Sequence, residues 1–145
     1  MNKEKTALFI GYSSIYINID DLIKKEMIKL IHKGTDTFLN GGMGGFDLMC
    51  ARCINQLKEE YPHIKHYLVI PYLSFNRCER EMFDDTIYPE LEKYHYKFAI
   101  PKRNQWMIEN SSYALCYIDH DWGGAIKTYR MAVKKKLNVI NIAEL

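Results

Sequence analysis

The sequence predicts an α/β domain with a three-layer, Rossmann-like fold around a mainly parallel sheet of about six strands. Strand-like apolar runs alternate with segments of helical periodicity along the 145 residues, which is the order of a parallel sheet with crossover helices. Several of these runs, such as residues 7–10, are apolar throughout, as strands buried on both faces are. Two glycine pairs, Gly41-Gly42 and Gly123-Gly124, each stand between a strand-like run and a helix-like run.

In the first half of the chain, glycine, proline and acidic residues mark where the expected elements end. Apolar residues spaced three and four apart predict a first helix, which Asp20 or Asp21 can cap and which Gly34 stops. Pro62 ends a second helix, because proline lacks the amide that a helix interior needs. The expected elements are strand 6–10, a helix from 20 or 21 to about 33, strand 35–40, helix 46–60 and strand 66–70.

The second half is less regular before residue 113. Residues 77–93 alternate charged and apolar side chains, which predicts one or two helical pieces around Pro89. After the second glycine pair, an apolar stripe predicts a helix, and the lysines at 134–136 suit the negative end of its dipole. The expected elements are strand 96–100, helix 103–111, strand 113–118, a helix after Gly124 and strand 138–142. No linker or repeat divides the chain, so we expect one domain over residues 1–145.

The glycine pairs predict an anion site. A glycine turn that feeds a helix lets a ligand approach the backbone, and the free amides and dipole of the helix favour a phosphate. Ligands of parallel α/β sheets bind beyond the carboxyl ends of the strands, where Gly11, Gly41, Gly42, Asp119 and Gly123 are expected. Residues 41–45 match neither the G-x-G-x-x-G fingerprint nor a P-loop. A plain tight turn is the alternative for each cluster taken alone.

Composition narrows the function classes. The net charge is only +2, so no global field recruits nucleic acid or a membrane surface. No apolar run approaches the length of a membrane span or signal peptide, which predicts a cytoplasmic protein. Cys50 and Cys53 form a C-x-x-C, but both fall on the apolar face of the second helix, so we interpret them as core residues. We therefore expect no metal and no cofactor.

Three stretches, residues 38–54, 103–119 and 122–142, together carry a family resemblance. They resemble the SLOG superfamily of Rossmann-like domains, which also includes the cytokinin-activating LOG proteins and the DNA-processing protein DprA. The resemblance spans nearly the whole chain. Within the superfamily, the chain is similar above all to the short, stand-alone bacterial YspA/YpsA-like branch. The resemblance implies a domain that binds nucleotides or nucleotide-derived ligands.

The resemblance also implies a set of site residues. Gly41, Gly42, Gly44 and Asp47 correspond to the first ligand loop, Arg103 and Asn104 to the helix before the fifth strand, and Asp119, Gly123, Gly124 and Thr128 to the second loop. Relatives usually carry a Gly-His-Arg type of loop after the first strand. Here that loop is Gly11, Tyr12 and Ser13, so a basic contact to the ligand is missing.

The sequence alone does not decide whether the protein is an enzyme. The LOG-type phosphoribohydrolases carry an Arg, which Arg103 resembles, and a Glu at a place where this chain has Tyr129 and Arg130. Cleavage of an N-glycosidic bond builds positive charge on the ribose, which a carboxylate stabilises. Asp47 and Asp119 are the first candidates to take the role of that Glu, and Asp121 and Glu109 are the second. The alternatives are structural: helix or turn acids for these four, and a surface ion pair for Arg103.

Three functions follow as hypotheses. The first is binding or sensing of a nucleotide-derived small molecule, with Tyr12 and Trp122 as candidates to stack on a base or to be buried in packing. The second is an N-glycosidase, phosphoribohydrolase or nucleoside transferase. The third is DprA-like binding of single-stranded DNA through Arg130 and the lysines at 134–136. We do not expect nucleic acid or a membrane as a partner, and the resemblance leaves a homo-oligomer open.

Overall fold

Six parallel strands form one sheet in the order β4-β3-β2-β1-β5-β6. The structure is a computed structural model that describes residues 1–15 and 17–145. The strands are β1 (Thr6–Gly11), β2 (Thr37–Asn40), β3 (Lys65–Val69), β4 (Asp85–Ile87), β5 (Tyr113–Tyr117) and β6 (Asn138–Asn141), and the helices are α1 (Asp20–His32), α2 (Gly45–Leu57), α3 (Ala99–Glu109) and α4 (Gly124–Lys134). The expected α/β, Rossmann-like fold class is confirmed.

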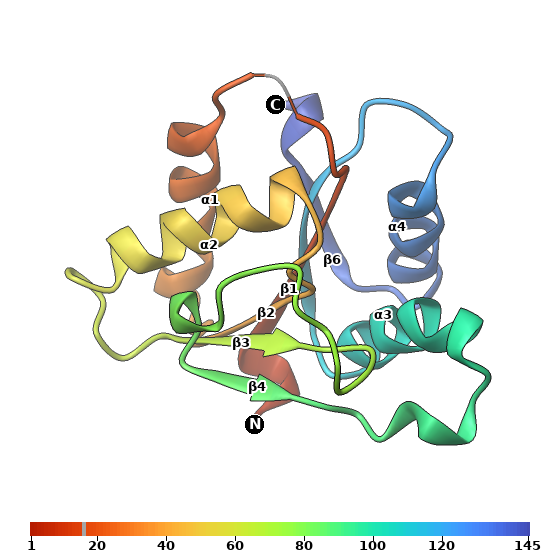
Figure 1. The fold of residues 1–145 in the computed structure, drawn as a ribbon. Helices are drawn as coiled ribbons and strands as arrows, with labels where there is room; N and C mark the ends of the chain where they lie inside the picture. Colours follow the sequence, from red (N-terminus) through yellow and green to blue (C-terminus); the bar gives the residue numbers. More distant parts are fainter. Residues whose placement is uncertain (16) are drawn as a thin grey trace.

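The helices cover both faces of the sheet and make it a three-layer structure. Figure 1 shows α1 and α2 on one side of the strands and α3 and α4 on the other. The two cores follow from β1, where Ala7 and Phe9 face the first helix pair and Leu8 and Ile10 face the second. Both sets are buried, which explains why this strand is apolar at every position.

One expected strand is wrong. Residues 96–98 form a short 3-10 turn and α3 begins at Ala99, so the run 96–100 contributes no strand. Pro101 fits there because the first turn of a helix does not need its missing amide. The sixth strand is β4 instead, in the segment that was expected to be helical. The cap of α1 also differs, because the side chain of Asn18 accepts from the amide of Asp20 and neither aspartate caps the helix.

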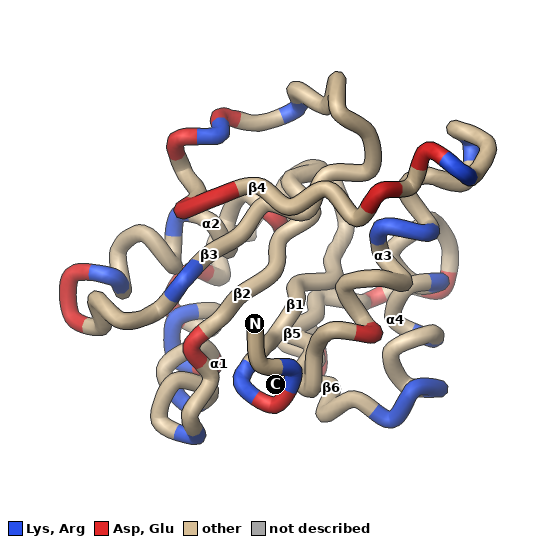
Figure 2. The backbone as a smooth tube through the Cα atoms, turned by 90° about the horizontal axis from the view of Figure 1, so that it is seen from below, with Lys and Arg blue, Asp and Glu red and all other residues tan. Residues whose placement is uncertain are grey.

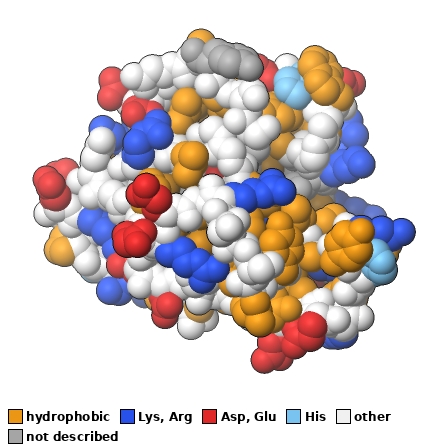
Figure 3. All heavy atoms as spheres, in the orientation of Figure 1, with side chains coloured by type: hydrophobic (Ala, Val, Ile, Leu, Met, Phe, Trp, Pro, Cys, Tyr) orange, Lys and Arg blue, Asp and Glu red, His pale blue; other side chains and the backbone are white. Residues whose placement is uncertain are grey.

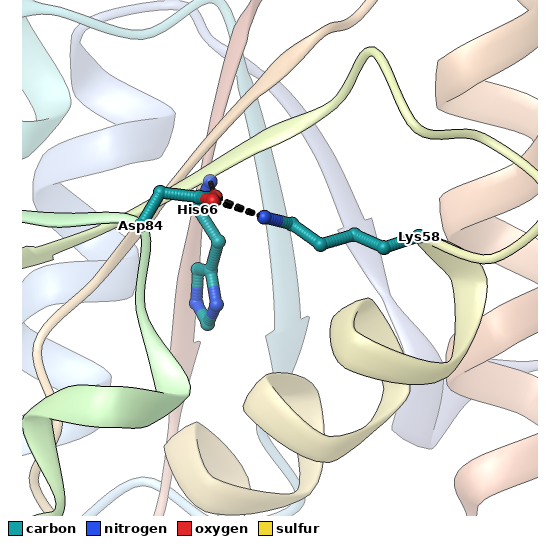
Figure 4. Close-up of polar contacts among 3 residues, drawn as sticks. All are labelled: Lys58, His66 and Asp84. Carbon is teal, nitrogen blue, oxygen red and sulfur yellow. Dashed lines mark hydrogen bonds and ion pairs between the residues drawn. The ribbon is translucent and has the colours of Figure 1, made fainter.

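Asp84 attaches the edge strand β4 to β3. Its amide donates to the carbonyl of His66 over 2.8 Å, and its carboxylate accepts from the amide of His66 over 2.7 Å. Lys58, at the end of α2, forms an ion pair with the same carboxylate (Figure 4). Partial burial opposes ionisation of Asp84, but these two donors outweigh it and lower its pKa below the usual value. The three-residue strand β4 is thereby attached both to β3 and to the end of α2.

The α2 thiols are core residues, as the sequence predicts. Cys50 and Cys53 are free and fully buried. Burial raises the pKa of Cys53 to about 11 and that of Cys50 well above its usual value, so both stay protonated at neutral pH. Across the described residues, no helix is long and apolar enough to cross a membrane.

The imidazole of His66 is buried without a polar partner. The side chain is fully buried beside Phe9 and Phe83, neither ring nitrogen has a hydrogen bond, and Figure 4 shows the ring turned away from the Lys58–Asp84 pair. Burial lowers the pKa of His66 to about 3. The folded protein therefore holds this ring neutral at pH values where the unfolded chain protonates it.

We predict that His66→Leu removes part of the acid sensitivity of folding. Because the unfolded chain binds the proton below about pH 6.5 and the folded chain binds it only near pH 3, His66 makes stability fall as the pH falls through this window. The slope from this one group reaches at most about 1.4 kcal/mol per pH unit. Urea unfolding of both proteins at several pH values measures it. Parallel pH curves for the two would contradict the prediction.

Candidate functional site

A cavity of about 590 Å³ opens at the carboxyl end of β1, between the first turns of α3 and α4. Eleven of the residues that the sequence singles out line it: Gly11, Tyr12, Ser13, Gly41, Asp47, Arg103, Asn104, Trp122, Gly123, Gly124 and Thr128. Gly42, Gly44 and Asp119 do not lie on its wall. Further lining residues that the sequence did not point to as site residues include Ser14, Met43, His120 and Lys127. The strand-end rim is therefore hollow where a ligand was expected.

Arg103 is buried beneath the cavity, with 2% of its surface exposed. Its Nη1 donates to the carbonyls of Gly41 (3.0 Å) and Val69 (2.6 Å), and its Nη2 contacts the sulfur of Met43 (3.2 Å). Burial lowers its pKa to about 10, opposed by the charge of Asp47, so it is ionised at neutral pH. A surface ion pair therefore does not describe this side chain, which also lines the cavity. It joins the first glycine loop to the end of β3.

Asn104 continues this connection to α4. Its Oδ1 accepts from Nε of Arg103 over 2.8 Å, and its Nδ2 contacts the hydroxyl of Thr128 over 3.2 Å. That hydroxyl in turn donates to the carbonyl of Gly124 over 3.4 Å. The first turn of α4 is therefore fixed in position relative to α3 by side chains that also line the cavity.

The first glycine loop has little capacity left for an anion. At the start of α2, the amide of Gly45 donates to the carbonyl of Ser13 over 2.7 Å, and that of Phe46 donates to Tyr12 over 3.2 Å. The three glycines of this loop that lie off the cavity wall, Gly42, Gly44 and Gly45, are closely packed. A Cβ would come within 2.6 Å of Leu68 at Gly42, within 2.5 Å of Ser13 at Gly44 and within 2.8 Å of the Ser13 carbonyl at Gly45. Contacts within the protein thus use two of the amides at the start of α2.

The second glycine pair is different. Gly123 precedes α4 with φ +95° and no side chain caps the helix. The amides of Gly124, Ala125 and Ile126 have no partner among the hydrogen bonds of the described residues, as geometry dictates for a first helical turn. A Cβ on Gly124 would meet no atom within 4 Å. This helix end therefore presents free donors and a positive dipole to open space at the cavity.

Asp47 is the one carboxylate on the cavity wall within the described residues. Its Oδ2 accepts from the amide of Met43 over 3.0 Å. Burial raises the pKa of Asp47 to about 6, although the Met43 amide and the charge of Arg103 act in the opposite direction. Of the four acids considered for catalysis, Asp119, Asp121 and Glu109 do not line the cavity. Tyr129 and Arg130 also lie off the wall.

Three aromatic rings stack at the mouth of the cavity. The ring centroid of His120 lies 3.6 Å from that of Tyr12 and 3.8 Å from that of Trp122, and the rings are nearly parallel. The hydroxyl of Tyr12 also donates to the carbonyl of His120. Tyr12 is buried, whereas Trp122 is 67% exposed. The stack therefore ends in a ring face or edge that solvent reaches.

Two structural residues of the site escaped the sequence analysis. Asn40 is fully buried, accepts from the amide of Gly42 over 2.8 Å and donates to the carbonyl of Asp47 over 2.9 Å. His120 forms the middle of the aromatic stack. An asparagine directly before a glycine cluster is the signal that could have found Asn40, since its side chain readily bonds nearby backbone. Nothing in the sequence distinguishes His120 from its polar neighbours.

A family profile described as the YspA SLOG family matches residues 8–143. The chain belongs to this family. A UPF0398 protein from Halalkalibacterium halodurans is 25% identical in an alignment that covers 81% of this SLOG chain and 68% of the relative. A UPF0398 protein from Staphylococcus haemolyticus is 22% identical, with 94% of this chain and 85% of the relative covered. The SPbeta prophage-derived protein YoqJ of Bacillus subtilis is 26% identical over 82% and 78%. The resemblance found in the sequence is thus confirmed.

Solved structures share the fold of this SLOG domain. DprA from Streptococcus pneumoniae superimposes with a TM-score of 0.70 at 15% identity, and DprA from Helicobacter pylori, described with a single-stranded DNA binding mode, superimposes with 0.68 at 14%. Both matches cover 94% of this chain. The chain spans 50% and 64% of those two proteins, so the likeness concerns the Rossmann-like domain alone.

We predict that Arg103→Met destabilises the fold by about 3 kcal/mol, because it removes hydrogen bonds from a charged donor and leaves the carbonyls of Gly41 and Val69 buried without a partner. Lys102→Met changes the neighbouring, half-exposed cation and serves as the control. Chemical denaturation of the three proteins measures the difference. Equal stability of both variants would show that the guanidinium does not hold the loop.

Proposed function

We propose that this SLOG domain binds a nucleotide or nucleotide-derived small molecule in the cavity. The observation that carries the proposal is the free N-terminus of α4, which opens on the cavity at Gly123 and Gly124. Three uncapped amides and the helix dipole favour a phosphate there, and Lys127 on the same wall adds a positive charge. Membership of the SLOG family supports binding of a nucleotide-type ligand at this coarse level.

The other walls suit the remaining parts of a nucleotide. The exposed Trp122 continues the stack of Tyr12 and His120, so a base can add a further ring to it. Asp47 is an acceptor on the wall, to which ribose hydroxyls can donate. The volume of about 590 Å³ lies within the usual range for small-molecule sites. Phosphate, sugar and base therefore each have a matching surface in one cavity.

We predict that Lys127→Met weakens binding of a nucleotide and that Lys134→Met does not. Both lysines are exposed on α4, but only Lys127 lines the cavity, so the pair separates a local contact from a change in net charge. Thermal shift of the wild type with AMP, ATP, cyclic AMP and ADP-ribose comes first, where a ligand at 100 times its Kd stabilises by about 2.7 kcal/mol. For the nucleotide that shifts the wild type, Kd should rise roughly tenfold in Lys127→Met.

Gly124→Val provides a second variant for the same test. The glycine lies in open space, so the folded protein should tolerate the side chain, whereas a phosphate at the α4 amides would collide with it. The unliganded melting temperature should stay near that of the wild type while the nucleotide-induced shift disappears. A wild type that none of the four nucleotides stabilises would refute the proposal.

Cleavage of an N-glycosidic bond is a second candidate function, because Asp47 places a carboxyl with a pKa of about 6 on the cavity wall. Such a group exists in both protonation states near neutral pH, as an acid or base in glycoside cleavage requires. We expect any release of free base from nucleoside monophosphates to fall at least a hundredfold in Asp47→Asn, since one acid–base group contributes roughly 10²–10⁴-fold.

Chromatography of wild-type and Asp47→Asn reactions measures this release. The conservative variant keeps the size of the side chain, so a nucleotide-induced thermal shift that survives in it shows that the cavity is intact. Absence of base from the wild-type reaction, with binding retained, would leave binding as the function.

A further inference from the structure

The segment before α3 carries an unusual surface of alternating aromatic and basic side chains. Residues 93–98 read Lys-Tyr-His-Tyr-Lys-Phe, and no carboxylate occurs from 93 to 102. Tyr96 is 81% exposed and Phe98 is 48% exposed, although rings of this size are normally covered. Figure 3 shows hydrophobic, histidine and basic side chains gathered at the lower right, with acidic side chains below them, where Figure 1 places this segment.

The rings and lysines of this surface are arranged together. The ring centroid of His95 lies 4.6 Å from that of Tyr96 and 6.4 Å from that of Phe98. The ammonium groups lie over ring faces: Lys102 is 4.6 Å and Lys93 is 5.3 Å from the centroid of Tyr94, and Lys97 is 5.2 Å from that of Phe98. Charge and stacking surface are therefore only a few ångströms apart.

We propose that this surface, from Lys93 to Lys102, binds a single-stranded polynucleotide. Single strands offer unpaired bases that stack on exposed rings and phosphates that pair with lysines, so both halves of the surface are used at once. A duplex fits this surface less well because its base faces are stacked inside the helix. An acidic peptide fits less well because it does not carry a planar ring beside each negative charge. No carboxylate interrupts the three lysines from 93 to 102, although Glu90 and Glu92 directly precede them, and Figure 2 shows red next to blue there.

The surface also adjoins the cavity. Ile100 and Pro101, which directly follow the exposed rings, line the cavity wall. A strand that lies on Tyr96 and Phe98 is thus a neighbour of the cavity. The proposal does not require the cavity to hold a mononucleotide, and it places the nucleic-acid contact away from Arg130 and the lysines at 134–136, where the sequence suggested it.

The test is fluorescence anisotropy with labelled 15-nucleotide oligothymidylate and oligouridylate at 50 mM NaCl, with a duplex of the same length in parallel. The ring variant is Tyr96→Ala with Phe98→Ala, and Tyr96→Phe is its conservative partner. The charge variant is Lys93→Gln with Lys97→Gln, and Lys134→Gln with Lys135→Gln removes the same charge elsewhere. All six positions lie at the surface, and a cooperative thermal transition verifies the fold of each variant.

We expect the wild type to bind one or both single strands more tightly than the duplex. The ring variant should lose roughly tenfold or more in affinity, Tyr96→Phe should retain it, and the charge variant should reduce the salt dependence by the equivalent of about two phosphate contacts. The Lys134 and Lys135 variant should stay within about twofold of the wild type. No binding at 50 mM NaCl, unchanged affinity of the ring variant, or equal losses in both lysine variants would each overturn the proposal.

Discussion

The buried guanidinium of Arg103 is the interaction on which the shape of the site depends. A charged side chain that is only 2% exposed is tolerated where hydrogen bonds within the protein replace those to water. Arg103 donates such bonds to the carbonyls of Gly41 and Val69 and to the side chain of Asn104. These partners come from the first glycine loop, the end of β3 and the second turn of α3. One side chain thereby fixes three segments around the cavity, and Asn104 extends the connection to α4 through Thr128.

The two glycine pairs show how one sequence pattern serves two purposes. Both stand between a strand and a helix, and both helices begin without a side-chain cap. The amides at the start of α2 are used by the loop after β1, which lies so close that a Cβ on Gly44 would collide with Ser13. The start of α4 has no such neighbour. The chain thus uses the first pair to bring two loops together and keeps the second pair open to the cavity.

The sequence predicted most of the fold because its signals are local. Apolar runs with glycine or proline at their ends located five of the six strands and all four helices, with small shifts at the boundaries. The error at residues 96–100 arose because an apolar run before a proline fits either a strand or a helix start. β4 was missed because its stability comes from contacts of Asp84 with His66 and Lys58, which are distant in sequence. Long-range pairing of this kind leaves no local pattern.

For the site, the sequence could locate the rim but not the direction in which each group points. Arg103 was expected to contact an anion; it lines the cavity, but its Nη1 donates to backbone carbonyls. Gly124 lies where a ligand can approach. Burial raises the pKa of Asp47, although the Met43 amide and the charge of Arg103 act in the opposite direction. The Met43 amide and the charge of Arg103 therefore offset only part of the cost of burying an ionised Asp47. A ligand that brings hydroxyl donors to this carboxylate and a phosphate to the α4 amides would give both groups hydrogen-bond partners, which is why we propose a sugar phosphate and not a purely anionic ligand.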